Sequence, residues 1–162
     1  MKIVAIDPGY ERLGVAILEK VSGSRETLLF SECFKTLAIE KHEKRLNLIG
    51  AEVSKIIKKY KPGALAIETL FFETNAKTAM KVSEARGVIL YEAAKNGLTV
   101  REFTPLEIKV AVTGYGKSDK RQIIDMVDRL IEIKKEIKHD DEYDAIAVGL
   151  TYFATIKSFP QA

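Results

Sequence analysis

The sequence lacks the features expected of a secreted or membrane-spanning chain. It contains a single cysteine, Cys33, so no disulfide can form within the chain, and we expect a reducing, cytoplasmic setting. No apolar run approaches the roughly 20 residues needed to cross a bilayer. The N-terminal residues enter a strand pattern without the layout of a signal peptide. We therefore expect no membrane partner, and we expect Cys33 to be an ordinary strand or buried residue.

The sequence also has little excess of charge of one sign. It holds 26 Lys and Arg against 23 Asp and Glu, a net charge of +3, which permits a polyanionic partner without requiring one. The 46% of hydrophobic and 30% of charged residues exclude a disordered chain. The 162 residues contain no repeat, low-complexity tract or linker. One domain spanning residues 1–162 is therefore predicted.

Hydrophobic periodicity predicts an α/β fold in which strands come first and helices dominate later. The expected strands cover residues 2–7, 14–20, 26–35, 64–68 and 98–103. The expected helices cover residues 41–60, 75–96, 105–114, 118–131 and 141–156. We expect Thr104 and Ser118 to cap the third and fourth helices. The first three strands resemble an antiparallel meander, and residues 64–68 are continuously apolar, as in a strand buried on both faces. The order predicts a mixed five-stranded sheet with helices on both faces.

Two acidic residues end apolar strands. Asp7 closes the first strand, directly before Pro8-Gly9, and Glu68 closes the strand at residues 64–68. An ionised carboxylate at the end of a buried strand is costly to desolvate without a partner, and a divalent cation is one such partner. If the two strands are neighbours, both carboxylates project from the same end of the sheet, where ligand sites of such sheets often lie.

A second pair of acids lies near the C-terminus. Asp141 and Asp144 are three residues apart on a predicted helix, so they share a face, and the small residues that follow allow this helix to lie close to the sheet. Four carboxylates favour Mg²⁺ or Mn²⁺ over zinc. Two such ions ~4 Å apart can activate a water and stabilise the leaving oxygen in phosphodiester hydrolysis. Taken singly, each acid could instead be a turn residue, a salt-bridge partner or a favourable charge at a helix N-terminus.

Several segments resemble the RuvC family of Holliday-junction resolvases. They are residues 6–9 (IDPG), 67–72 (IETLFF), 85–88 (ARGV), 113–120 (TGYGKSDK) and 141–147 (DEYDAIA), together with Asn75. The resemblance implies a ribonuclease H-like fold and a homodimer that hydrolyses symmetry-related phosphodiester bonds of a four-way junction in recombination and repair. It also implies a RuvA–RuvB branch-migration complex as partner. It assigns catalysis and magnesium binding to Asp7, Glu68, Asp141 and Asp144.

The last segment departs from the family pattern. The family usually has two small residues between the final two acids, whereas this chain has Glu142 and Tyr143. Asp140 adds a further acid, and the spacing to Asp144 favours Asp141 over Asp140 as the metal ligand.

Aromatic and basic residues are candidates for DNA contact. Phe71 follows Glu68 closely, and the resemblance assigns it to stacking on an unpaired base, while Phe72 is expected in the core. The basic candidates for holding phosphates are Lys109, Lys117, Lys120 and Arg121. They surround a glycine-rich turn at residues 114–116 that we expect beside the metal site. Lys120 is also a candidate general base.

The helix at residues 75–96 carries apolar residues on more than one side. One side can cover the sheet and the other can form a two-fold interface, although the whole helix could also be buried within one subunit. Arg86, on this helix, could contact DNA or make an intrachain ion pair.

Three other functions fit parts of the pattern. A nuclease of the same fold acting on RNA or RNA–DNA hybrids would need the same acids. An ATPase of the sugar-kinase and actin type would need further glycine-rich phosphate loops, which are missing. A DNA-binding module without catalysis would have no chemical need for all four acids.

Overall fold

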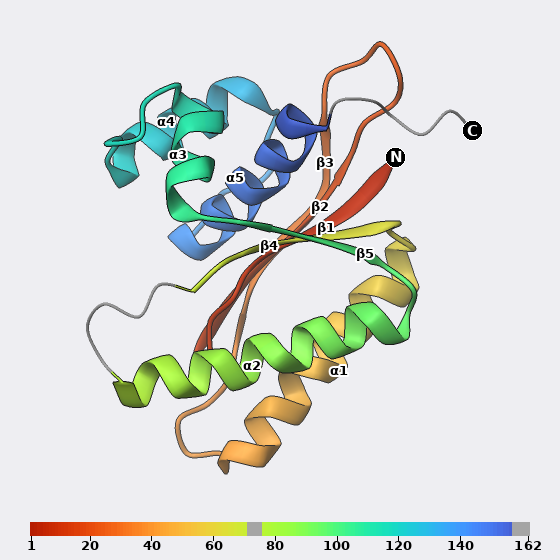
Figure 1. Ribbon diagram of the computed structural model, residues 1–162, viewed down its shortest axis with the longest axis vertical. Coiled ribbons are helices and arrows are strands. Elements are labelled where there is room, and N and C mark those ends of the chain that lie inside the picture. The colour runs from red at the N-terminus through yellow and green to blue at the C-terminus, as the bar shows by residue number, and fades with distance from the viewer. Residues whose placement is uncertain (71–75, 157–162) are drawn as a thin grey trace.

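A five-stranded mixed sheet forms the centre of the protein, and the computed structural model describes residues 1–70 and 76–156. The strand order is β3-β2-β1-β4-β5 (Figure 1). The antiparallel meander comprises β1 (Lys2–Asp7), β2 (Arg12–Glu19) and β3 (Thr27–Lys35). The parallel part adds β4 (Ala64–Glu68) beside β1, then β5 (Thr99–Phe103). The predicted sheet is confirmed.

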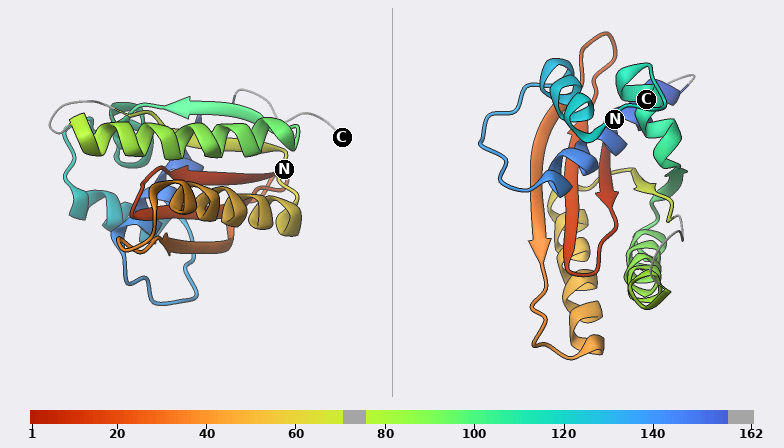
Figure 2. Two further views of the ribbon diagram at one scale, coloured as in Figure 1. Left: turned by 90° about the horizontal axis from the view of Figure 1, so that it is seen from below. Right: turned by 90° about the vertical axis from the view of Figure 1, so that its left-hand side faces the viewer.

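Helices cover both faces of the sheet (Figures 1 and 2). One face is covered by α1 (His42–Tyr60) and α2 (Ala76–Lys95). The other is covered by α3 (Pro105–Thr113), α4 (Lys120–Leu130) and α5 (Asp140–Thr155). No helix within residues 1–70 and 76–156 is both long and apolar enough to cross a bilayer.

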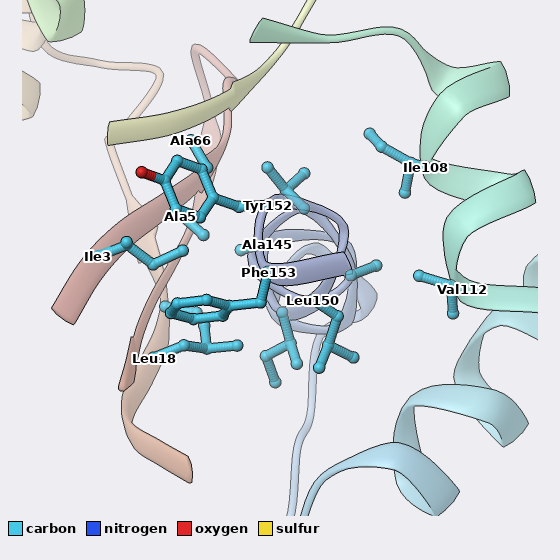
Figure 3. Close-up of a cluster of buried hydrophobic side chains, with 14 of the residues drawn as sticks. Ile3, Ala5, Leu18, Ala66, Ile108, Val112, Ala145, Leu150, Tyr152 and Phe153 are labelled. Carbon is cyan, nitrogen blue, oxygen red and sulfur yellow. The ribbon is translucent and has the colours of Figure 1, made fainter. Parts of the chain in front are cut away.

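The two faces of the sheet contribute side chains to two separate cores, because side chains alternate along a strand. Val4 and Ile6 of β1 point into the core under α1 and α2, whereas Ile3 and Ala5 point into the core under α5. Small side chains on the α5 side let this helix lie close to the sheet (Figure 3). A Cβ added at Gly149 of α5 would lie 3.2 Å from the Cβ of Ala5. The expected close approach of α5 is therefore confirmed.

The parallel pairing of β1 with β4 determines where the strand-end acids lie. Ile6 is paired with Ile67, so Asp7 and Glu68 follow at the same end of two adjacent strands. On the other side of β1, Asp7 is paired with Gly14 of β2. The expectation that the two strands are neighbours is confirmed.

The two predicted helix caps fare differently. Thr104 caps α3 in a capping box with Glu107, as predicted. The predicted cap at Ser118 is wrong, because Asp119 caps α4 and forms a capping box with Gln122. The Ser118 hydroxyl instead donates to the carbonyl oxygen of Tyr115 at 2.7 Å, which ties the preceding turn together.

Candidate active site

Asp7 lies among three other carboxylates. The pKa of the Asp7 carboxyl is raised well above its ordinary value, first by burial and then by the negative charges of Asp144, Glu68 and Asp141. The nearby Lys120 ammonium offsets only part of this rise. The four acids predicted from the sequence therefore lie close enough to influence one another's charge, although they come from β1, β4 and α5.

Glu68 is perturbed in the same direction. Burial, followed by the negative charge of Asp144, raises the pKa of the Glu68 carboxyl to about 7, and Lys120 and Lys109 oppose this shift. A carboxyl with this pKa is only about half ionised at neutral pH. A cation placed beside it would lower its pKa and hold it in the ionised form.

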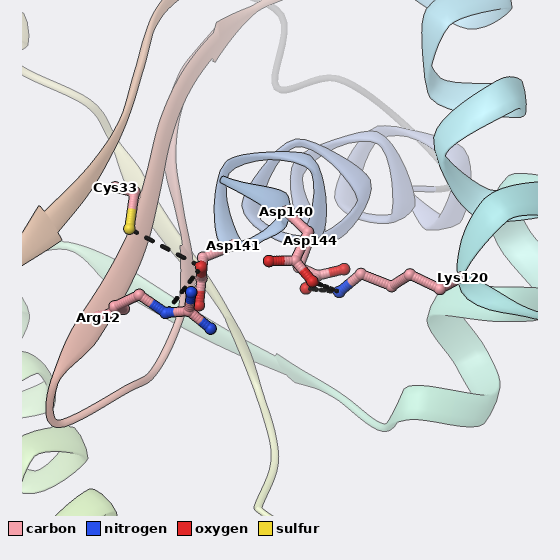
Figure 4. Close-up of polar contacts among 6 residues, drawn as sticks. All are labelled: Arg12, Cys33, Lys120, Asp140, Asp141 and Asp144. Carbon is pink, nitrogen blue, oxygen red and sulfur yellow. Dashed lines mark hydrogen bonds and ion pairs between the residues drawn. The ribbon is translucent and has the colours of Figure 1, made fainter. Parts of the chain in front are cut away.

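The acids of α5 point to different neighbours (Figure 4). Asp141 forms an ion pair with Nε of Arg12 at 3.3 Å and accepts a hydrogen bond from Sγ of Cys33 at 3.8 Å. Asp144 pairs with Nζ of Lys120. Asp140 also pairs with Lys120, at 3.2 Å, and this ammonium lowers the pKa of its carboxyl.

These contacts separate the roles of Asp140 and Asp141. Asp140 is exposed and faces Lys120, and its charge is not among the main influences on Asp7. Asp141 is partly buried, and its charge raises the pKa of Asp7. The geometry therefore favours Asp141 as the acid that shares the site with Asp7.

Gly14 lets the start of α5 approach the strand ends. A Cβ at this position would overlap the backbone carbonyl of Asp141 and lie 3.3 Å from the Cβ of Asp7. Since any larger residue would push α5 away from β2, the glycine is required for Asp7 and Asp141 to come close.

A cavity of about 300 Å³ opens beside the acids. Glu68 and Asp144 line it together with Lys109 and Lys120, while α3, α4 and α5 supply apolar walls that include Ile108. Two of the four predicted acids, Glu68 and Asp144, and two of the four predicted basic residues thus line one pocket. The other two, Lys117 and Arg121, lie on the exposed surface around the same turn.

Lys120 carries a proton in this arrangement. Burial lowers the pKa of its ammonium, but hydrogen bonds to Asp144 and Asp140 outweigh burial and raise it above the ordinary value. A general base needs a free electron pair, so the ion-paired Lys120 is better suited to bind an anion than to accept a proton.

The donor set suits a hard divalent cation. All four side chains offer carboxylate oxygens, the ligands that Mg²⁺ and Mn²⁺ prefer. Burial and the repulsion of the neighbouring acids raise the pKa of Asp7, and a bound cation would relieve that repulsion. Among the described residues, no three acid, histidine or cysteine side chains already converge on one metal-sized point. Arg12 and Lys120 draw Asp141 and Asp144 toward themselves instead.

Some predicted contacts lie elsewhere. Phe71, Phe72 and Asn75 fall outside the described residues. Arg86 forms an ion pair with Glu102 of β5, which is the intrachain alternative considered from the sequence.

Sequence reasoning missed two neighbours of the acids. Cys33 lies in β3 as expected, yet its thiol contacts Asp141, and burial together with that carboxylate raises its pKa to about 11, so it remains a neutral thiol. Arg12 has no motif around it, and only the pairing of β1 with β2 shows that it lies near the acids.

Comparison with known proteins identifies the family. The model of the family "Crossover junction endodeoxyribonuclease RuvC" matches residues 3–152. The chain belongs to the RuvC family. RuvC of Thermosipho melanesiensis is 45% identical over 149 residues, which cover 92% of this chain and 94% of that protein. RuvC of Moorella thermoacetica is 41% identical over 152 residues, which cover 94% of this chain and 90% of that protein.

Solved structures agree with this assignment. The structure of T. thermophilus RuvC in complex with Holliday junction substrate is similar to this RuvC-family chain with a TM-score of 0.88 and 30% identity. The similarity covers 94% of this chain and 93% of that one. The predicted ribonuclease H-like fold is therefore confirmed.

Proposed function

We propose that this RuvC-family chain resolves four-way Holliday junctions by hydrolysing symmetry-related phosphodiester bonds in homologous recombination and DNA repair. The observation that carries the proposal is the meeting of carboxylates from β1, β4 and α5 beside a pocket that also holds Lys109 and Lys120. This combination provides both a cation site and positive charges for a phosphodiester backbone. The Thermus thermophilus relative has been seen with such a junction.

The proposed metal ligands are Asp7, Glu68, Asp141 and Asp144. Together they suit two Mg²⁺ ions, for which Mn²⁺ can substitute. When bound, the ions supply an activated water and charge stabilisation for the leaving oxygen. The four carboxylates hold negative charge at one end of the sheet, and Lys109 and Lys120 attract the phosphate to that end.

The remaining DNA contacts follow from position. Lys117 and Arg121 are exposed around the turn beside the pocket, where they can neutralise phosphates farther along the strand. Phe71 follows Glu68 closely in sequence, and we propose that it stacks on an unpaired base at the junction centre. Phe71→Ala should therefore weaken binding to a junction more than binding to a linear duplex.

Paired cleavage requires two copies of the site, so we propose that the protein acts as a homodimer in the cytoplasm, together with a RuvA–RuvB branch-migration complex. Exposed apolar side chains on α2 offer a surface for the two-fold contact, because Met80 is 65% and Tyr91 63% exposed. Light scattering of the protein in solution should give twice the chain mass, and Tyr91→Glu should shift it toward the monomer.

The decisive experiment compares a labelled four-way junction, a matched linear duplex and an RNA–DNA hybrid, each with magnesium and with EDTA. Paired nicks on the junction alone, lost in EDTA, are expected. Preferential cleavage of the hybrid would instead identify a nuclease of the same fold with a different substrate. The same assay with Asp7→Asn tests the metal site, because persistent cleavage by this variant in magnesium would contradict the assignment.

A further inference from the structure

Glu142, which stands where the family usually has a small residue, is buried and lies between two of the proposed metal ligands in the sequence. Its side chain is 8% exposed although it lies in the first turn of α5. Its Oε2 accepts a hydrogen bond from Oγ of Ser31 at 2.9 Å and an ion pair from Nζ of Lys135 at 2.5 Å. The same Lys135 ammonium donates to the carbonyl oxygen of Ser31 at 2.6 Å. We call these three residues the Ser31–Lys135–Glu142 clamp.

The clamp joins segments that are far apart in sequence. Ser31 belongs to β3, which forms one edge of the sheet, and Lys135 belongs to the connection between α4 and α5. Lys135 thus ties that connection to the edge strand, and Glu142 ties the first turn of α5 to both. A buried carboxylate with two partners of this kind is fixed in one position, since loss of either partner leaves it poorly compensated.

The clamp acts on the same strand that Asp141 touches. Ser31 and Cys33 are two residues apart on β3, so their side chains lie on one face of the sheet. Consecutive acids of α5 meet them, since Asp141 contacts Cys33 and Glu142 contacts Ser31. These contacts set how far α5 is rotated about its own axis, and that rotation determines where Asp141 and Asp144 point.

We propose that the Ser31–Lys135–Glu142 clamp is a positioning device for the metal centre, holding α5 in the rotation that keeps Asp141 and Asp144 near Asp7. The inference rests on the proposed function, because it takes these acids as metal ligands. None of the clamp's members is a proposed metal ligand. They act through the helix that carries two of the proposed ligands, in the way that residues outside a metal's own ligand set orient those ligands.

Removing the charge of Lys135 tests the proposal, because positioning and electrostatics predict opposite changes in the affinity for a divalent cation. Lys135→Met removes a positive charge close to the acids, so electrostatics alone would make a divalent cation bind more tightly. Positioning requires the opposite, because a loosened α5 presents Asp141 and Asp144 in more than one orientation. Loss of such an orienting partner typically weakens metal binding by about 10- to 100-fold.

Lys134→Met is a matched control. Lys134 is the neighbouring residue, its side chain is 81% exposed, and its ion pair with Glu132 is 3.9 Å long between two exposed side chains. Lys135→Arg should keep much of the wild-type affinity for Mn²⁺, since it leaves a cation at the same place. Ser31→Ala removes one hydrogen bond of the clamp without changing any charge, and it covers the case in which Lys135→Met fails to fold.

The measurement is the dissociation constant of Mn²⁺ for the DNA-free full chain, determined by calorimetry, together with the thermal midpoint in EDTA. We expect about tenfold weaker Mn²⁺ binding for Lys135→Met, a smaller weakening for Ser31→Ala, and no change for Lys134→Met. Unchanged or tighter Mn²⁺ binding in both clamp variants, with a lowered thermal midpoint, would mean that the clamp only stabilises the fold. This result would overturn the inference and leave the proposed metal centre in place. Failure of the wild-type protein to bind Mn²⁺ would overturn the proposed metal centre and the inference with it.

Discussion

Asp7 is the residue whose pKa is raised by all three of the other acids. Since the pKa of Asp7 is raised by burial and by three neighbouring carboxylates, this carboxyl makes the metal-free protein less stable at neutral pH than at acidic pH, where it is protonated in both the folded and the unfolded chain. We expect Asp7→Asn to lose magnesium-dependent cleavage while gaining stability. Each unit of pKa shift is worth about 1.4 kcal/mol, and 1 kcal/mol corresponds to roughly 2–4 °C in a chain of this size.

Thermal unfolding of Asp7→Asn in EDTA at pH 7 measures this gain. A thermal midpoint below that of the wild-type protein would show that the carboxylate is stabilised by contacts and not strained by repulsion. Junction binding measured in Ca²⁺ or EDTA should persist and would show that the variant is folded.

Glu68 makes the stability of the metal-free protein depend on pH. Its pKa in the folded protein is about 7, above the ordinary value of 4.5, so the unfolded chain releases this proton first as the pH rises. The stability linked to Glu68 is therefore fully present below about pH 4.5 and is lost as the pH rises through about 7. The thermal midpoint in EDTA should decline over this window, and Glu68→Gln should flatten the decline.

Metal binding should show the opposite trend with pH. Carboxylates bind a cation in their ionised form, so Mn²⁺ binding should tighten from pH 6 to 8 and release protons to the buffer. Calorimetry in two buffers of different ionisation enthalpy measures that release. Proton release that is the same in Glu68→Gln would assign it to another group.

At the scale of the elements, the approach of α5 to β2 depends on Gly14. A methyl group there would overlap the carbonyl of Asp141, and overpacking of this kind typically costs about 1–3 kcal/mol. We expect Gly14→Ala to lower the stability by this amount and to reduce cleavage strongly, because α5 carries Asp141 and Asp144. Urea unfolding and junction cleavage measure the two effects.

Gly63→Ala is the control for this substitution. Nothing lies within 4 Å of a Cβ at Gly63 and its φ is not positive, so stability and cleavage should both stay close to wild type. Equal effects of the two substitutions would mean that the close approach at Gly14 does not hold the acids in place.

The elements were largely predictable from sequence because their signals are local. Alternating apolar residues, the proline at residue 105 and the glycine at residue 114 give the strands and α3 nearly as observed. The start of α4 was not, since Ser118 and Asp119 are adjacent residues of similar capping chemistry. Gln122, three residues after Asp119, completes the capping box and was the usable signal.

The candidate site was predictable only in part. The strand-end acids are visible because a charge is unusual after an apolar run. The surroundings of Glu142 were not, because Ser31 lies 111 residues away and only the folded sheet brings the two together. The ion pair of Arg12 with Asp141 is hidden for the same reason.

At the scale of the whole molecule, a net charge of +3 is too small to account for DNA binding, so the distribution of the charge matters. Lys117 and Arg121 lie around the turn beside the acid pocket. We expect Lys117→Ala and Arg121→Ala each to weaken junction binding and to reduce the slope of log K against log salt by about 0.9.

Fluorescence anisotropy at several salt concentrations, in EDTA or Ca²⁺, measures that slope. Lys58→Ala is the control, because Lys58 is exposed on α1, which covers the opposite face of the sheet. An equal change of slope for all three variants would indicate general attraction of DNA to the protein surface and no defined track.

The ion pairs of Lys120 with Asp144 and Asp140 give the acid cluster an internal counter-ion. Part of the carboxylate charge is thus balanced by the chain itself, and two buried cores hold the sheet and helices together independently of this end of the molecule. We therefore expect a metal ion to enter a protein that is already folded, unlike the zinc of a zinc finger, which folds its domain. Chelation of the metal, or a shortage of magnesium in the cell, should therefore stop the activity reversibly. The chain should stay folded and escape degradation.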